Sequence, residues 1–263
     1  MCRLLAVVSS EATDYRFSLR HAPRSLAALS REHPDGWGLA VHNDERGWEL
    51  SKHPACAGQD ERYDDAAAAA HGKILIAHVR KRTIGPVGVL NTHPFRRGRW
   101  VFAHNGTIPD TSWLEDRTSD ERRREIEGET DSERLFAFLL SAIDRARPGE
   151  ADAILADEIG AAIARPGFGA ANFILSDGNV LYAHRHGRTL HLLERGRGDR
   201  VRSSRESMET GAVVETPWSA RRVAVLMASE HMTDEPWQAV EEGSLLRVDA
   251  GAFPTSRVVS RAG

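Results

Sequence analysis

Short apolar runs separated by polar turns recur through the first hundred residues of the chain. Residues 4–8, 74–79 and 100–104 are apolar segments of strand length, and the last two run directly into polar clusters. Residues 38–42 and 48–51 flank a polar turn, a pattern that predicts a β-hairpin. We therefore expect the N-terminal part of the chain to be rich in strands.

Two helices are predicted between these strands. The first starts near Pro23, because proline is favoured in the first turn of a helix. It stops by His33, because the residue before a proline is pushed out of helical geometry. The second covers the alanine-rich residues 60–71, with Gly72 expected at its C-terminal end.

The second half of the chain begins with helices and ends with strands. Thr130 and Glu133 have the spacing of a capping box, and apolar residues continue at helical spacing to about residue 146. A further helix is predicted over residues 151–164. Asp177-Gly178 is a hairpin signal between two of the strands that follow. The strands predicted here cover residues 172–175, 180–184, 223–228 and 245–248.

This order of elements indicates a fold class. Hairpin-linked strands in two blocks, with paired helices between them, favour antiparallel sheets covered by helices over a parallel doubly wound fold. The chain has 263 residues and 41% apolar content, which is enough for a full core. No linker and no repeating unit divides it. We expect an α+β fold in a single domain spanning residues 1–263.

Composition narrows the class of partner. The formal net charge is −3, which gives no general attraction to nucleic acid or to an anionic membrane. Two cysteines are too few for a disulfide framework, and the apolar run at residues 4–8 is too short for a signal peptide. We expect a cytoplasmic protein with neither nucleic-acid nor membrane partners. One basic cluster lies in a stretch read as a solvated loop or an anion site: Arg195, Arg197, Arg200, Arg202 and Arg205.

The first candidate for chemistry is the cysteine at position 2. Removal of Met1 would leave Cys2 with both a thiol and a free α-amine. An amine that titrates near about pH 8 can accept the proton of a thiol that titrates near about pH 8.5, as in enzymes with an N-terminal nucleophile. The alternative is a cysteine that only packs at the start of a strand.

Other polar residues at strand ends and helix starts offer what amide hydrolysis of an amino-acid substrate needs. Arg80 could bind an α-carboxylate, or it could lie on the surface. Asn105 and Gly106 could donate to an oxyanion, or they could form a tight turn. Asp131 could pair with a substrate ammonium or favour the helix dipole, and His93 could orient the site or satisfy a loop.

Six motifs, in order along the chain, resemble the glutaminase domain of class II glutamine amidotransferases, and the similarity is greatest to the small stand-alone members. The motifs cover residues 1 to about 140, with a weaker echo at residues 228–230. They are Met1-Cys2-Arg3, Asp35-Gly36-Trp37-Gly38, Ala77-His78-Val79-Arg80-Lys81-Arg82-Thr83, Asn91-Thr92-His93-Pro94, Ala103-His104-Asn105-Gly106 and Gly128-Glu129-Thr130-Asp131-Ser132-Glu133.

The resemblance implies the fold of N-terminal-nucleophile hydrolases, a four-layer αββα sandwich of antiparallel sheets. It also implies that Cys2 is the nucleophile and that its own amine is the base. Asn105 and Gly106 would form the oxyanion hole. The reaction implied is hydrolysis of the γ-amide of glutamine through a Cys2 thioester, which releases ammonia and glutamate.

The resemblance also implies how the substrate is held. Arg80 would bind the α-carboxylate and Asp131 the α-ammonium, while Thr83 and His93 would line or support the pocket. No cofactor and no metal is expected in this reading. A metal site at His184 and His186 is the alternative, but no third and fourth ligand lie at a recognisable spacing.

The substrate remains open at this point. The chain leaves no room for the synthase domain of the larger amidotransferases, so a separate synthase subunit is one expectation. Stand-alone members of the family also hydrolyse a γ-glutamyl amide intermediate, as in the ergothioneine pathway, and this is the alternative activity. A non-catalytic binding subunit is a third reading. In each case the ligand expected is a small molecule, glutamine or a γ-glutamyl compound.

Overall fold

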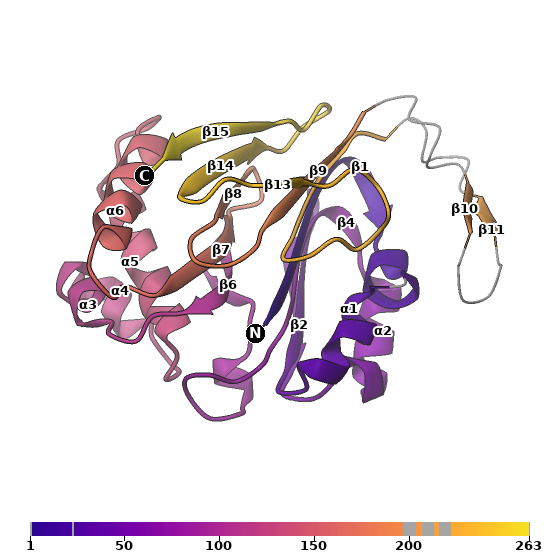
Figure 1. Cartoon of the computed structure of the whole chain (residues 1–263), viewed down its shortest axis with the longest axis horizontal. Helices are drawn as coiled ribbons and strands as arrows, with labels where there is room; N and C mark the ends of the chain where they lie inside the picture. Colours follow the sequence, from indigo (N-terminus) through magenta and orange to yellow (C-terminus); the bar gives the residue numbers. More distant parts are fainter. Residues whose placement is uncertain (1, 23, 197–203, 207–212, 216–221, 263) are drawn as a thin grey trace.

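Two large antiparallel sheets form the centre of the molecule (Figure 1). The computed structural model describes residues 2–22, 24–196, 204–206, 213–215 and 222–262. The expected helix start at Pro23 and the side chains of Arg197, Arg200, Arg202 and Arg205 lie outside the described residues. Within the described part of the chain, no helix has the length and apolar composition needed to cross a membrane.

The first sheet, called sheet A, places the N-terminal strand β1 at its centre, between β12 and β4. Its strand order is β13-β9-β12-β1-β4-β2-β3. The bounds are β1 (Arg3–Asp14), β2 (Trp37–Asn43), β3 (Gly47–His53), β4 (His71–Val79), β9 (His191–Arg195), β12 (Ala224–Ala228) and β13 (Gln238–Ala239).

The second sheet, called sheet B, has the order β15-β14-β8-β7-β6-β5. Its bounds are β5 (Phe95–Arg97), β6 (Trp100–Thr107), β7 (Ala170–Ser176), β8 (Val180–His184), β14 (Ser244–Asp249) and β15 (Ser256–Arg261). A separate two-stranded ribbon pairs β10 (Ser204–Glu206) with β11 (Val213–Glu215). The hairpins predicted around residues 43–47 and at Asp177-Gly178 are confirmed as β2–β3 and β7–β8.

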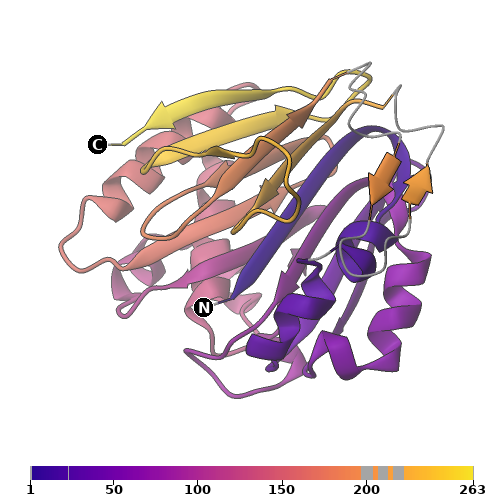
Figure 2. The ribbon, with the colours of Figure 1, turned by 45° about the vertical axis from the view of Figure 1, so that its right-hand side comes forward.

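Helices cover the outer face of each sheet, so the molecule has four layers (Figure 2). Helices α1 and α2 lie on sheet A, and α5 and α6 lie on sheet B. The αββα sandwich of antiparallel sheets is therefore confirmed. The helices are α1 (Leu26–Leu29), α2 (Glu61–Ala69), α3 (Ser112–Arg117), α4 (Asp120–Arg124), α5 (Asp131–Arg145) and α6 (Ala151–Ile163), with single turns η1 (Phe17–His21), η2 (Ser30–Glu32), η3 (Ala57–Gln59) and η4 (Val89–Asn91).

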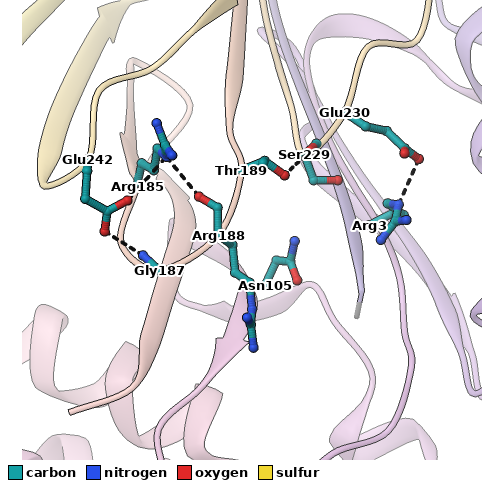
Figure 3. A pocket seen from close by; sticks show the side chains of 9 residues that line it. All are labelled: Arg3, Asn105, Arg185, Gly187, Arg188, Thr189, Ser229, Glu230 and Glu242. Carbon is teal, nitrogen blue, oxygen red and sulfur yellow. Dashed lines mark hydrogen bonds and ion pairs between the residues drawn. The ribbon is translucent and has the colours of Figure 1, made fainter. Parts of the chain in front are cut away.

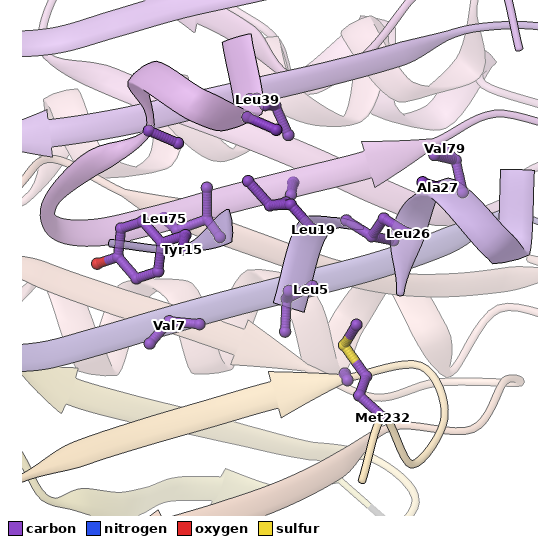
Figure 4. Close-up of a cluster of buried hydrophobic side chains, with 14 of the residues drawn as sticks. Leu5, Val7, Tyr15, Leu19, Leu26, Ala27, Leu39, Leu75, Val79 and Met232 are labelled. Carbon is purple, nitrogen blue, oxygen red and sulfur yellow. The ribbon is translucent and has the colours of Figure 1, made fainter. Parts of the chain in front are cut away.

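The alternation of side chains along β1 explains why one apolar strand serves two cores. Leu5 and Val7 point toward the helices and pack with Leu26, as Figure 4 shows. Leu4 and Val8 point the other way and belong to the core between the sheets. Because both faces of the strand are buried, a continuous apolar run is the pattern expected for it.

One predicted boundary is wrong. Helix α2 ends at Ala69, and Gly72 is not at its C-terminal end but lies in β4, paired with Thr13 of β1. A side chain on Gly72 would overlap the carbonyl group of His42 in the neighbouring strand. Strand pairing therefore determines this position, and the glycine is needed for close approach of two backbones.

Candidate functional site

Three strands direct polar side chains into the space between the sheets. Residues at every second position share one face of a strand. Cys2 thus shares the inner face of β1 with Leu4, and Asn105 shares the inner face of β6 with Ala103. Arg80 follows β4 on the inner side, and the start of β1 pairs with the end of β4. Cys2 and Arg80 are therefore neighbours, facing the sheet that holds Asn105.

The thiol of Cys2 is buried, with 9% of the residue exposed. The backbone N–H of Lys81 donates a hydrogen bond to Sγ of Cys2 at 3.3 Å. The thiol in turn donates to the carbonyl of Lys81, also at 3.3 Å. Burial raises the pKa of the Cys2 thiol; the Lys81 hydrogen bond and the charge of Arg80 lower it, and the charge of Asp131 raises it. A buried thiol with a raised pKa is protonated at neutral pH, so its use as a nucleophile requires a base.

The guanidinium of Arg80 is buried and supports a loop. It donates to the carbonyl groups of Ile84, Gly85 and Pro86, at 2.9, 3.3 and 3.1 Å. Among the described residues it forms no ion pair with a carboxylate. Burial lowers the pKa of Arg80, and the charges of Asp35 and Asp131 partly offset this effect. The surface alternative is therefore wrong for Arg80, which is 3% exposed. Thr83 lies in the same segment but is exposed.

Asn105 is 5% exposed, and within the described residues its side-chain amide has no hydrogen-bond partner. It faces a cavity (Figure 3). Gly106 follows at the end of β6, paired with Ala171. A side chain there would overlap the carbonyl of Ala170 and the ring of His104, so only glycine fits this strand. The tight-turn alternative is wrong, because both residues belong to a paired strand.

Asp131 begins helix α5 and is 4% exposed. Its Oδ2 accepts a hydrogen bond from the N–H of Ile108 at 2.8 Å and lies 4.0 Å from Nδ1 of His104. The Thr130 hydroxyl accepts from the N–H of Glu133, which confirms the predicted helix start. Because the Asp131 charge affects the Cys2 pKa, the two groups lie within electrostatic reach of each other.

Three buried histidines, His78, His93 and His104, lie close together near these residues. The centroid of the His93 ring lies 4.3 Å from that of His78 and 4.5 Å from that of Phe95. In the described part of the chain, neither ring nitrogen of His93 has a hydrogen-bond partner. Burial holds the pKa of His93 well below its usual value, so the ring is neutral. Nε2 of His78 lies 3.2 Å from the carbonyl of His104.

Sequence reasoning assigned no role to His78, His104 or Ser132, although all three lie within the quoted motifs. Nδ1 of His104 lies 2.9 Å from the Ser132 hydroxyl, so His104 connects β6 to the first turn of α5. Their positions next to proposed site residues could have identified two of them: His104 directly precedes Asn105 in β6, and Ser132 directly follows Asp131 in α5. These contacts join the strand that carries Asn105 to the helix that carries Asp131.

A cavity of about 460 Å³ opens beside Asn105. Its walls are formed by Arg3, Asn105, Arg185, Gly187, Arg188, Thr189, Ser229, Glu230 and Glu242. Arg3 and Asn105 come from the sequence motifs and Ser229 and Glu230 from the weaker echo, whereas residues 185–189 and Glu242 lie outside both. Most of the lining residues are polar or charged, with charges of both signs.

The metal alternative finds no support in the geometry. Nδ1 of His184 lies 3.0 Å from the carbonyl of Ser244, and Nδ1 of His186 lies 3.1 Å from Glu242. In the part of the chain that the structure describes, no three His, Cys, Asp or Glu side chains form a group that could hold a metal ion.

The two sheets, the outer helices and the inward-facing Cys2, Arg80 and Asn105 define a fold of the N-terminal-nucleophile hydrolase type. The family described as "Glutamine amidotransferases class-II" matches residues 1–262. The chain belongs to this family.

Two relatives and one solved structure illustrate the family. A Haemophilus influenzae protein named "Putative glutamine amidotransferase" is 30% identical over 94% of this chain and 83% of its own length. The gamma-glutamyl-hercynylcysteine sulfoxide hydrolase of Mycobacterium tuberculosis is 33% identical over 41% of this chain and 50% of its own length. The glutamine phosphoribosylpyrophosphate amidotransferase of B. subtilis has the same fold, with a TM-score of 0.64 and 17% identity over 98% of this chain and 49% of its own.

Proposed function

We propose that this protein hydrolyses the γ-amide of a glutamyl substrate through a thioester on Cys2, after removal of Met1. The observation that supports this most directly is the Asn105 amide. The residue is 5% exposed, its amide has no partner among the described residues, and it faces a cavity between the sheets, the space toward which Cys2 also points. A donor that faces a cavity and has no internal partner is available to a ligand. We propose that residues 1–263 act as one domain in this reaction.

In the proposed first step, the α-amine of Cys2 takes the thiol proton and the sulfur attacks the amide carbon. The carbonyl π electrons move onto oxygen, where Asn105 and the N–H of Gly106 donate hydrogen bonds. As the carbonyl re-forms, the C–N bond breaks and the leaving nitrogen takes the proton from the ammonium of Cys2. Ammonia or an amine departs, and a γ-glutamyl thioester remains.

In the second step, the same amine deprotonates a water molecule, which attacks the thioester carbon. The C–S bond breaks, the sulfur regains the proton from the amine, and glutamate is released. The raised pKa of the buried Cys2 thiol is consistent with this scheme, because the sulfur is protonated at rest and is activated only by its own base.

The glutamyl half of the substrate would be held at both ends. Arg80 would bind the α-carboxylate and Asp131 the α-ammonium, with His93 supporting the site from below. Because Arg80 also donates to the carbonyl groups of residues 84–86, it would join the substrate to that loop. Thr83, in the same segment, would reach the substrate from the exposed side.

The substrate is either glutamine or a larger γ-glutamyl amide. Both contain the same glutamyl half and differ in the group that leaves. The second candidate is favoured by the cavity of about 460 Å³ beside Asn105, because neither Arg80 nor Asp131 lines it and it could therefore hold the other half of the substrate. With glutamine, a separate synthase subunit would be the partner that receives ammonia.

The experiment that tests the proposal compares wild type with Cys2→Ala and with Cys56→Ala, which removes the other cysteine in the sequence. Glutamate release is measured from glutamine and from γ-glutamyl amides, and intact mass is measured before and after a brief exposure to substrate. We expect a mature chain that begins at Cys2, an added γ-glutamyl group in wild type and Cys56→Ala, and no glutamate release by Cys2→Ala. Full activity with Met1 retained would contradict the proposal. Absence of glutamate release from every substrate would instead favour a binding subunit.

A further inference from the structure

The turn that lines the cavity, residues 185–190 between β8 and β9, is bonded to Glu242 and Ser229 and also, three times, to the side chain of Asn172. Oδ1 of Asn172 accepts hydrogen bonds from the N–H groups of His186 and Arg188, at 2.8 and 3.2 Å. Its Nδ2 donates to the carbonyl of Thr189 at 3.0 Å. Asn172 is buried and directly opposite Asn105 in the sheet. The turn therefore has a fixed position beside the side chain proposed to bind the oxyanion.

The charges in the cavity do not cancel. Arg3 pairs with Glu230 at 2.8 Å, and Arg185 pairs with Glu242 at 3.4 Å. Arg188 is the third arginine in the wall. Within the described residues its guanidinium has neither a hydrogen bond nor an ion pair, and the side chain is only half-buried. The walls thus carry three cations and two anions, with the excess positive charge on Arg188.

The side chain of Arg188 lines the same cavity as Asn105. Figure 3 shows its side chain running along the cavity toward Asn105. Its charge also contributes to the lowered pKa of His104, the residue before Asn105, although burial is the larger cause. A carboxylate bound to Arg188 would therefore share the cavity with an amide whose oxygen is bound to Asn105, away from Arg80 and Asp131, which do not line this cavity.

We propose that Arg188 binds a carboxylate on the leaving-group half of the substrate, so that the cavity selects γ-glutamyl amides of amino acids. The inference rests on the proposed function, because a leaving group exists only if an amide is cleaved. Ammonia carries no carboxylate and needs no more room than a water molecule, so it uses neither the volume of the cavity nor the guanidinium. An amino-acid leaving group uses both.

The test compares two substrates of nearly equal size that differ in one charge, γ-glutamylglycine and γ-glutamylglycinamide. We expect the ratio of their kcat/KM values in wild type to exceed that in Arg188→Met by about 10-fold or more, since a charge-assisted guanidinium–carboxylate contact is lost. Arg188→Lys should recover part of the preference. Arg62→Met, which removes an arginine with a 69% exposed side chain on α2, should keep the wild-type ratio.

The ratio does not depend on the fraction of active protein, because both substrates are measured on the same sample. The difference in leaving ability between the two amines cancels when the ratio of wild type is compared with that of a variant. A wild-type ratio equal to that of Arg188→Met would overturn the inference and leave the proposed function standing.

A binding experiment separates the carboxylate site from the proposed reaction. The affinity of Cys2→Ala for the same two compounds is measured by calorimetry. If wild type cleaves neither compound but Cys2→Ala binds γ-glutamylglycine more tightly through Arg188, the carboxylate site is supported and the proposed reaction is wrong. Equal affinities for the two compounds would overturn the carboxylate site.

Discussion

Asn105 and Asn172 are paired directly across strands β6 and β7, yet their side chains are in opposite states. Both ends of the Asn172 amide are used: its oxygen accepts from two N–H groups and its nitrogen donates to one carbonyl. The amide of Asn105 has no partner in the described residues and faces the cavity. One asparagine holds the wall of the cavity, and the other is left available for a ligand.

Replacing Asn105 with alanine should lower kcat for γ-amide hydrolysis by about 100-fold or more, with a smaller effect on KM. The reason is that an oxyanion donor acts mainly in the transition state. Steady-state kinetics on the purified variant make the measurement. Because the Asn105 amide has no internal partner to lose, the melting temperature should stay near that of wild type. A change confined to KM would show instead that Asn105 binds the ground state.

Substitution of Asp131 can separate the effect of its charge from the effect of its hydrogen bond. Asp131→Asn keeps an oxygen that can accept from the N–H of Ile108 but removes the negative charge. We expect kcat/KM to fall by about 30-fold or more, since a substrate ammonium would be left without its partner. The free energy of unfolding should change by less than about 1 kcal/mol.

The matched variant for this prediction is Asp131→Ala, which also leaves the Ile108 N–H without its partner. It should lose a further amount of about 1–3 kcal/mol in the free energy of unfolding, measured by urea denaturation. If Asp131→Asn retains full activity, the role of Asp131 is structural: it favours the helix dipole and holds the N–H of Ile108.

Gly106→Ala should destabilise the protein by about 1–3 kcal/mol and reduce activity. The added methyl group would overlap the Ala170 carbonyl and the His104 ring, so β6 or β7 must shift. Thermal melting and kinetics make the measurement. Gly251→Ala is the control, because a side chain there meets no atom within 4 Å, and its effect should stay within about 0.5 kcal/mol. A fully active and stable Gly106→Ala would show that the strands yield easily at this position.

His184 should make the protein less stable as the pH falls. Burial lowers the pKa of His184 in the folded protein to about 3, whereas in the unfolded chain it is close to 6.5. Between these values the unfolded state binds the additional proton, so the free energy of unfolding falls as the pH falls from about 6.5 toward 3. Each pH unit in this window costs up to about 1.4 kcal/mol.

His184→Asn tests this prediction, because it keeps a group that can donate to the carbonyl of Ser244 and removes the titration. We expect its stability to depend less steeply on pH than that of wild type between about pH 6.5 and 4, measured by urea denaturation at each pH. The exposed His71→Asn controls for the loss of a histidine in general. A slope equal to that of wild type would mean that His184 does not stay neutral in the folded protein. Some slope will remain in His184→Asn, because the pKa values of His78 and His33 are also lowered by burial, to about 3 and about 4.

Local sequence determined much of this molecule. Continuous apolar runs of strand length predicted β1, β4 and β6, and the alternation of side chains along a strand places Cys2 and Asn105 on the inner faces. The capping residue Thr130 marked the start of α5 and so the position of Asp131. These features are predictable because each depends on residues within a few positions along the chain.

Other features arise only when distant segments meet. The structure shows that the Arg80 guanidinium binds the carbonyl groups of residues 84–86, and that Gly72 belongs to a strand instead of ending a helix. It also brings the turn carrying Arg188 beside Asn105, more than eighty residues earlier in the chain, through the side chain of Asn172. Helical and strand periodicity report which face of an element is buried, but they do not report what is packed against that face. The partners of a buried charge are therefore set by the packing of the two sheets, and they can be recognised only in the tertiary structure.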